Sequence, residues 1–388
     1  MAGEARPVRP GIDVVLSDSL HLLRGRRIGL ITNQTGVGRG GTSGIDLLWE
    51  HPEVELVALF SPEHGIRGDA PEGEIIEEEV DSATGLVVHS LYGETRAPTS
   101  EMLEGIDVLL FDIQDVGARY FTYVSTMALA MEAAAPEDIH FVVLDRPNPI
   151  GGVQLQGNVL QPSFSSFMGM FRIAMRHGMT PGELARMSRD AGALDVELTV
   201  VPADGWRRSM AFDDTGLPWI PPSPNMPTVR TALHYPGTCL FEGTSLSVGR
   251  GTDRPFEQVG APWLDGPELA RRLEARDLPG VRFEAVRFTP RDPTDGKHDG
   301  VEVSGVRFVA RGPDYDPTMA AVAALFEARH MAGERWEWRP DHFDLLAGTD
   351  RLRIGIDEGR TVEELTADWD AQLREYRQHR EPHLIYEP

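Results

Sequence analysis

Short apolar runs alternate with segments of helical periodicity over the first 150 residues. The apolar runs are rich in Val, Ile, Leu and Phe and cover residues 27–32, 54–60, 85–92, 106–114 and 140–149. The segments with helical spacing between them cover residues 42–50, 100–106 and 121–135. Continuous apolar strands separated by helices are typical of a parallel sheet that is covered on both faces. The pattern therefore predicts an α/β fold over residues 1–155, with a Rossmann-like, doubly wound, mostly parallel sheet.

The pattern becomes less regular after residue 155. Residues 281–288 and 301–308 alternate as strands of an antiparallel unit do, and helices are expected at about 317–331 and 361–378. Thr180 and Glu183 have the spacing of a capping box at the start of another helix. We therefore expect residues 156–388 to form a second, smaller α+β domain.

Polar side chains follow each predicted strand of the first domain. In chain order they are Asn33; Glu63 and His64; Tyr92 to Arg96 with Glu94; Asp112, Gln114, Asp115, Arg119 and Tyr120; and Asp145 to Asn148. The carboxyl ends of parallel strands lie at one edge of a sheet, and ligands bind beyond that edge. Five such clusters together predict a lined pocket.

Composition narrows the class of partner. The chain of 388 residues carries 61 acidic and 37 basic residues, and its net charge of −24 argues against nucleic acid or an anionic membrane as partner. No apolar run approaches the roughly 18 residues of a membrane span, and the first residues lack the apolar core of a signal peptide. These features predict a cytoplasmic protein, and the sequence leaves its oligomeric state open.

Three other chemistries have weaker support in the sequence. The glycine-rich stretch 36–41 fits a dinucleotide fingerprint, but it begins four residues after its strand, so we interpret it as a loop. Cys239 is the single cysteine, and a lone cysteine in such a segment is more often buried packing than a nucleophile. A metal site of Glu63, His64, Asp112 and Asp115 is conceivable, but no paired His spacing accompanies these four residues, so neither a metal nor another cofactor is expected.

The carboxylates support glycoside hydrolysis best. That reaction needs a protonated acid near the leaving oxygen and a second group that activates water or attacks the sugar. Glu63 follows an apolar strand and Pro62, a setting that favours the protonated form of a carboxyl group. In a strand order of 3-2-1-4-5, Glu94 would lie about 5 Å away on the next strand and Asp112 about 10 Å away. The sequence leaves open which of these two acts with Glu63.

The same residues carry a resemblance to a known family. The blocks LFSPEHGIRGD, SLYGETRAPT, DVLLFDIQDVGARYFTY and YPGTCLFEGTSLSVGRGTDRPFE resemble the exo-β-N-acetylmuramidases, bacterial glycoside hydrolases long treated as a family of unknown function. The resemblance runs from about residue 12 to the end of the chain. It implies removal of N-acetylmuramic acid from the non-reducing end of peptidoglycan fragments during cell-wall recycling. It also implies a Rossmann-like domain, a smaller second domain, a cleft between them, and neither metal nor nucleotide.

The resemblance also implies roles for particular residues. Glu63 matches the catalytic acid, with Glu94 or Asp112 beside it. The positions that match cleft residues are Gln114, Asp115, Arg119, Tyr120, His177, Asn225 and Glu242. Asn33 and His64 are expected to bind substrate from the strand ends, and Arg119, Arg250 or Arg254 is expected to pair with the lactyl carboxylate of the sugar. The alternative function is a protein that binds or senses cell-wall sugars without cleaving them.

Overall fold

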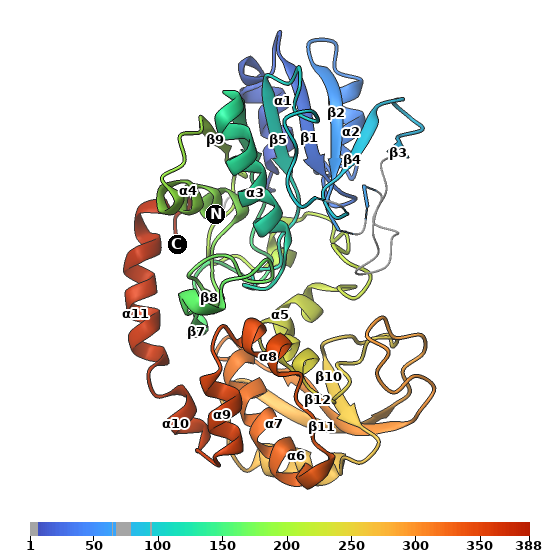
Figure 1. Cartoon of the computed structure of the whole chain (residues 1–388), viewed down its shortest axis with the longest axis vertical. Coiled ribbons are helices and arrows are strands. Elements are labelled where there is room, and N and C mark those ends of the chain that lie inside the picture. The colour runs from blue at the N-terminus through green and yellow to red at the C-terminus, as the bar shows by residue number, and fades with distance from the viewer. Residues whose placement is uncertain (1–6, 64, 67–78, 94) are drawn as a thin grey trace, which may run out of the picture.

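Two domains stack along the long axis of the molecule (Figure 1). The computed structural model describes residues 7–63, 65–66, 79–93 and 95–388. The first domain holds a sheet made of β1 (Arg27–Thr32), β2 (Glu55–Ser61), β3 (Glu79–Val80), β4 (Val87–Ser90), β5 (Val108–Asp112), β6 (His140–Leu144) and β9 (Leu198–Val201). The strand order is β3-β4-β2-β1-β5-β6-β9, and every neighbouring pair except β3 and β4 is parallel. The central five strands thus have the order 3-2-1-4-5 considered above.

Helices cover both faces of this sheet, which explains its continuous apolar strands. Successive residues of a strand point to opposite faces. In β5, Val108 and Leu110 belong to the cluster that includes α1 (Gly11–Asp18) and α2 (Gly44–Trp49). Leu109 and Phe111 belong to the opposite cluster, which includes α3 (Tyr123–Ala134) and α4 (Pro181–Gly192). The predicted α/β fold is confirmed.

Local signals set the ends of several helices. The Ser43 side chain accepts a hydrogen bond from the Ile45 amide at the start of α2, and Thr180 and Glu183 form the predicted capping box of α4. The helix expected at 100–106 is wrong, because residues 101–105 form turns. The seven residues 100–106, which include Gly105 with a φ of 82°, are too few to form a stable helix without a packed face.

The second domain is built on a smaller antiparallel sheet. Its strands β10 (Gln258–Ala261), β12 (Val303–Ala310) and β11 (Val281–Phe288) lie in that order. Its helices are α5 (Val229–Thr238), α6 (Gly266–Glu274), α7 (Pro317–Ala332), α8 (Pro340–Ala347), α9 (Arg351–Asp357) and α10 (Val362–Thr366). Helix α6 packs on β11 and β12, and α7 packs against both α5 and α6. The second predicted domain is therefore an α+β unit as expected.

The end of the chain returns to the first domain. Helix α11 (Trp369–Arg380) runs back along the side of the molecule and packs on β7 (Gln156–Val159), which pairs with β8 (Ala174–Arg176) (Figure 1). The Tyr386 hydroxyl then donates a 2.6 Å hydrogen bond to Asp145 at the end of β6.

The boundary expected at residue 155 lies inside the sheet of the first domain. Strand β6 precedes residue 155, strand β9 follows it, and the two strands pair with each other.

Membrane insertion through a helix has no structural support in the described residues. Among them, no helix combines the length and the apolar character that crossing a bilayer requires.

Candidate active site

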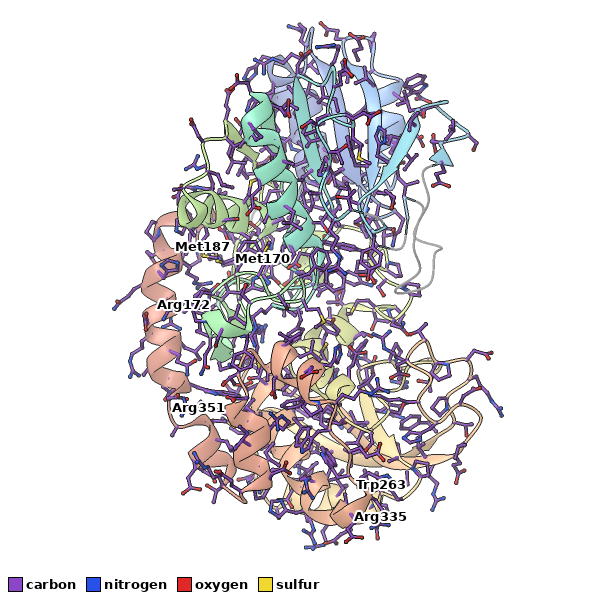
Figure 2. All side chains as sticks on the ribbon, in the orientation of Figure 1. Met170, Arg172, Met187, Trp263, Arg335 and Arg351 are labelled. Atoms are coloured by element: carbon purple, nitrogen blue, oxygen red, sulfur yellow. The ribbon has the colours of Figure 1, made fainter. Side chains whose placement is uncertain are left out.

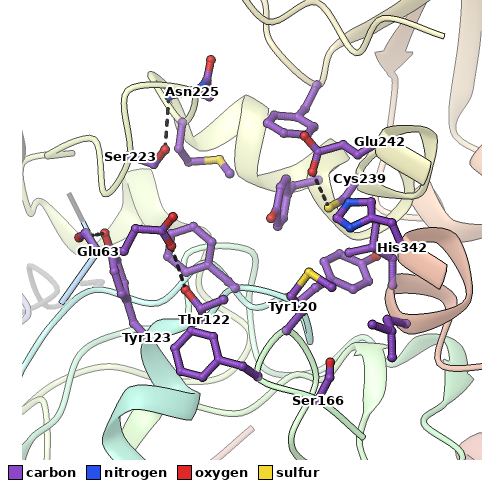
Figure 3. A pocket seen from close by; sticks show the side chains of 18 of the residues that line it. Glu63, Tyr120, Thr122, Tyr123, Ser166, Ser223, Asn225, Cys239, Glu242 and His342 are labelled. Carbon is purple, nitrogen blue, oxygen red and sulfur yellow. Dashed lines mark hydrogen bonds between the residues drawn. The ribbon is translucent and has the colours of Figure 1, made fainter. Parts of the chain in front are cut away.

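A pocket of about 400 Å³ lies between the two domains. The first domain and its following loops contribute Glu63, Tyr92, Arg96, Tyr120, Phe121, Thr122, Tyr123, Ser166, Phe167, Met168, Ser223, Asn225 and Met226. The second domain contributes Tyr235, Cys239, Glu242, Arg250, Phe256, His342, Leu345 and Leu346. Figure 3 shows Glu63 and Glu242 on opposite sides of the cavity. The two predicted domains therefore form a joint site with a carboxylate on each side.

Glu63 lies two residues beyond the end of β2 and is half-buried. Its Oε2 accepts a hydrogen bond of 3.2 Å from the hydroxyl of Thr122, the residue that precedes α3. The Tyr123 hydroxyl contacts the Glu63 carbonyl at 3.4 Å and donates to the Pro222 carbonyl at 2.6 Å. The carboxylate at the tip of β2 is thus oriented from the start of the neighbouring helix and borders the cavity.

Glu242 lies in the short 3₁₀ helix η5 (Cys239–Gly243) that follows α5. Burial opposes its charge, but the Arg250 guanidinium, 2.6 Å away, holds the pKa of this carboxyl below its ordinary value. The Cys239 thiol donates to the other carboxylate oxygen at 3.4 Å, and burial raises the pKa of that thiol. Burial also lowers the pKa of His342, which favours its neutral form. The second domain therefore lines the cavity with the ionised carboxylate of Glu242, the neutral thiol of Cys239 and the neutral ring of His342.

Aromatic rings form much of the pocket lining and join the two domains. Phe121 meets Tyr123 edge to face at 4.9 Å and Tyr235 at 6.0 Å, measured between ring centroids. Tyr235 packs in the same manner on Phe256 at 4.8 Å. The Tyr120 hydroxyl donates to the Pro236 carbonyl of α5. Such rings offer the apolar faces on which a sugar stacks, with hydroxyl groups that can bond its oxygens.

Several predicted site residues do converge at the sheet edge but lie outside the pocket lining. The Asp112 carboxylate is fully buried and paired with Arg146 at 2.6 Å. Asn33 accepts hydrogen bonds from the amide and hydroxyl of Thr35, and Gln114 donates to the Pro147 carbonyl. These side chains hold the loops at the strand ends together. Asp112 is therefore not available as the carboxylate that acts with Glu63.

Asp115 and His177 form a second buried pair behind the pocket. Their Oδ2 and Nε2 atoms lie 3.4 Å apart, and both side chains are almost completely buried. Asp115 also accepts from the Gly117 amide, while the Met179 amide donates to the other ring nitrogen of His177. Neither residue borders the cavity, so both predicted substrate contacts are supports for loops in this structure.

The arginines expected to bind the sugar carboxylate lie in three different settings. Arg119 is buried and donates to the carbonyls of four residues, which are Asn158, Ile173, Leu346 and Ala347. Burial lowers its pKa to about 10. Arg254 lies outside the pocket lining and pairs with Glu257 at 3.2 Å. Of the three, only Arg250 borders the cavity. His64 and Glu94 lie outside the described residues.

Other cavities have less suitable chemistry for glycoside hydrolysis. A larger depression of about 1050 Å³ is lined by Trp219, Arg176, Arg208 and mainly apolar residues, with Asp213 as its single acidic residue. Within residues 7–63, 65–66, 79–93 and 95–388, no three His, Cys, Asp or Glu side chains are grouped to hold a metal ion. The smaller cavity, with a carboxylate from each domain, is therefore the candidate active site.

Some pocket residues were not assigned a role from the sequence. His342 lies in α8 and reaches the cavity only because that helix packs on η5. Tyr235 lies in one of the blocks that resemble the muramidase family, and Arg96 lies in one of the polar clusters that follow the strands. For neither residue did the sequence pattern indicate a function. The tryptophans Trp206, Trp219 and Trp263 do not line the candidate active site.

The chain matches one known family along most of its length. The family model described as the N-terminal part of exo-beta-N-acetylmuramidase NamZ matches residues 28–230, and the model for its C-terminal part matches residues 233–386. This chain belongs to the NamZ family. NamZ proteins are exo-β-N-acetylmuramidases, so the predicted membership of a glycoside hydrolase family is confirmed. The two NamZ models meet close to the start of α5, beyond β9.

Individual relatives agree with the NamZ assignment. The chain is 45% identical over 381 residues to the peptidoglycan beta-N-acetylmuramidase NamZ of Bacillus subtilis (strain 168), covering 98% of this chain and 91% of the relative. Two crystal structures of DUF1343 family proteins from Bacteroides fragilis NCTC 9343 have the same fold. The first has a TM-score of 0.91 at 37% identity and the second a TM-score of 0.78 at 32% identity. Each match covers 98% of this chain and 99% of the other chain.

Proposed function

We propose that this chain removes N-acetylmuramic acid from the non-reducing end of peptidoglycan fragments, with Glu63 as the general acid. The observation that carries the proposal is the position of Glu63, which borders the interdomain pocket at the end of β2 opposite the ionised Glu242. Membership of the NamZ family and the peptidoglycan beta-N-acetylmuramidase activity of the Bacillus subtilis relative support the same substrate class.

The pocket chemistry suits protonation of a leaving oxygen. Glu63 gives its proton to the glycosidic oxygen, and the sugar ring gains positive charge as the bond breaks. Water then adds to the positive carbon and loses a proton, which releases free N-acetylmuramic acid. Glu242 lies across the cavity as a carboxylate that Arg250 keeps ionised, and its charge stabilises a positive sugar ring. Glu94 remains a predicted partner of Glu63.

The size of the cavity favours a terminal sugar. A volume of about 400 Å³ is at the lower end of the range found for small-molecule sites. A pocket of this size encloses one sugar unit with its substituents more readily than a length of polysaccharide. This fits release of single N-acetylmuramic acid units from a chain end.

Substitution of Glu63 by Gln tests the proposal. With a chromogenic N-acetylmuramide we expect kcat to fall by about 10²–10⁴-fold, the usual contribution of a general acid, while binding of free N-acetylmuramic acid is kept. Glu132→Gln is the matched control, because Glu132 is exposed on α3 and lies outside the pocket lining. Equal turnover by Glu63→Gln and wild type would remove Glu63 from its role. Binding of the sugar without any turnover by the wild type would favour the sugar-sensing alternative.

A further inference from the structure

Arg96 borders the pocket with its guanidinium stacked on aromatic rings. Its Cζ lies 4.2 Å from the ring centroid of Phe167 and 5.7 Å from that of Tyr92. All three side chains line the cavity, and Arg96 itself is exposed to solvent. Stacking occupies the face of a guanidinium, so the N–H groups at its edge stay available for an acceptor.

The other cationic groups near the cavity already have carboxylate or carbonyl partners. Arg250 contacts Glu242, Arg254 pairs with Glu257 outside the lining, and Arg119 is enclosed by backbone carbonyls. Among the described residues, no carboxylate lies within ion-pair distance of Arg96. Arg96 is therefore the pocket arginine whose charge is not neutralised by an ion pair within the described part of the chain.

We propose that Arg96 binds the lactyl carboxylate of N-acetylmuramic acid and so distinguishes this sugar from N-acetylglucosamine. The inference rests on the proposed function, since it names the group of the substrate that this pocket recognises. A planar guanidinium matches a carboxylate through two parallel hydrogen bonds, and the rings of Phe167 and Tyr92 fix its plane before the ligand arrives. Pre-ordering reduces the entropy that is lost when the ligand binds.

The substrate carboxylate also needs a local cation for electrostatic reasons. The chain has a net charge of −24, and Glu63 and Glu242 both border the cavity. An anionic sugar would be repelled from this cavity unless a positive group faced its carboxylate. N-acetylglucosamine lacks the lactyl group and gains nothing from Arg96, so one side chain discriminates between the two sugars of peptidoglycan.

The decisive experiment compares two chromogenic substrates on Arg96→Gln. One is the N-acetylmuramide with its free carboxylate, and the other is the same compound with that carboxylate converted to a methylamide. We expect kcat/KM for the acid to fall by about 10- to 100-fold, the range for a lost charge-assisted pair, mainly through KM. For the neutral amide, kcat/KM should stay near the wild-type value. Arg96→Lys should recover part of the loss, because it restores the charge without the planar fork.

Arg335→Gln is the matched control. Arg335 also stacks on an aromatic ring, that of Trp263 at 5.5 Å, and Figure 2 shows both at the far end of the second domain. Equal losses on acid and amide substrates would overturn the proposal, because they indicate a structural role, and so would no loss on either.

A binding measurement separates this inference from the proposed function. Calorimetric titration with free N-acetylmuramic acid needs no turnover, so it tests Arg96 even if the wild type hydrolyses nothing. Weaker binding by Arg96→Gln than by wild type supports the proposal, and equal binding refutes it. N-acetylglucosamine serves as the ligand that should bind both forms alike.

Discussion

The guanidinium of Arg250 meets one oxygen of the Glu242 carboxylate twice, with Nε at 2.7 Å and Nη2 at 2.6 Å from Oε1. Only 5% of the Arg250 side chain and 13% of the Glu242 side chain are exposed. The thiol of Cys239 donates to the second oxygen of the same carboxylate. The pair therefore places a fixed, ionised carboxylate on the pocket wall, although its surroundings are largely removed from water.

Removing Glu242 should destabilise the fold as well as the site. Glu242→Ala removes the carboxylate that lies 2.6 Å from the buried guanidinium of Arg250, and breaking a buried ion pair typically costs about 3–5 kcal/mol of unfolding free energy. The exposed pair of Arg24 and Glu53 is the comparison, because solvent screens this pair and Glu53→Ala should change the unfolding free energy far less. Differential scanning calorimetry of both variants measures the contrast. Similar melting temperatures for the two variants would contradict it.

Arg119 should behave as a structural residue. Arg119→Met removes a guanidinium that donates to four backbone carbonyls, two of which keep a second donor, so we expect a loss of about 3 kcal/mol of unfolding free energy. KM for the sugar substrate should stay close to wild type in the folded fraction. Arg172→Met is the control, since Arg172 makes an exposed pair with Glu375. A stable Arg119→Met variant with a strongly raised KM would restore Arg119 as a substrate contact.

Lys297 is the only lysine of the chain, and its reactivity reports on the η5 region. Burial lowers its pKa to about 8, but only 5% of its side chain is exposed, and its Nζ donates to the carbonyls of Phe241, Glu242 and Leu246. We expect an amine-reactive ester at pH 8 to leave Lys297 unlabelled in the native protein and to label it in denaturant. Mass spectrometry of the peptide that contains residue 297 gives the answer. Rapid labelling of the native protein would refute the burial of this amine.

His234 should make the fold sensitive to acid. Its ring is fully buried, its Nδ1 lies 2.7 Å from the Tyr315 hydroxyl, and burial lowers its pKa to about 3. The native state therefore binds fewer protons than the unfolded chain, in which this group titrates near pH 6.5. Stability from this effect is complete above pH 6.5 and is lost as the pH falls toward 3, at up to about 1.4 kcal/mol per pH unit.

The variant His234→Gln tests this dependence. Gln has no titration in this range, so the difference in unfolding free energy between wild type and variant should shrink as the pH falls from 7 to 4. Urea unfolding at several pH values measures the difference. Parallel pH profiles for the two proteins would show that the ring is not the source of the acid sensitivity.

Some features of the fold were predictable because they depend on neighbouring residues in the chain. The apolar run ending at Ser61 had to be a strand covered on both faces, and the Thr180 and Glu183 pair had to start a helix. The position of Glu63 just beyond a parallel strand followed from the same periodicity. The segment 100–106 shows the limit, because its residues 101–105 form turns and seven residues have too little local preference to determine their own structure.

The role of each polar residue could be assigned only from the folded structure. Asp112 and Glu63 both follow apolar strands, yet Asp112 lies on a central strand where Arg146 from the next strand neutralises it, while Glu63 faces the second domain. Arg119, Arg250 and Arg254 look equivalent in the sequence. The carbonyls that Arg119 contacts lie up to 228 positions away in the chain, and no spacing rule relates such distant residues. Arg250 and Arg254 both pair with carboxylates close in the sequence, and only the packing of the second domain decides that Arg250 borders the cavity.

The α/β layering, the converging strand ends and the family membership could all be read from the chain, because periodicity and long matching blocks are local properties of the sequence. Which strand ends border a cavity and which form buried pairs became clear only after folding. A side chain's charge, partners and exposure depend on residues that folding brings beside it. The second domain, through Glu242 and His342, supplies half of a site that the first domain alone cannot enclose.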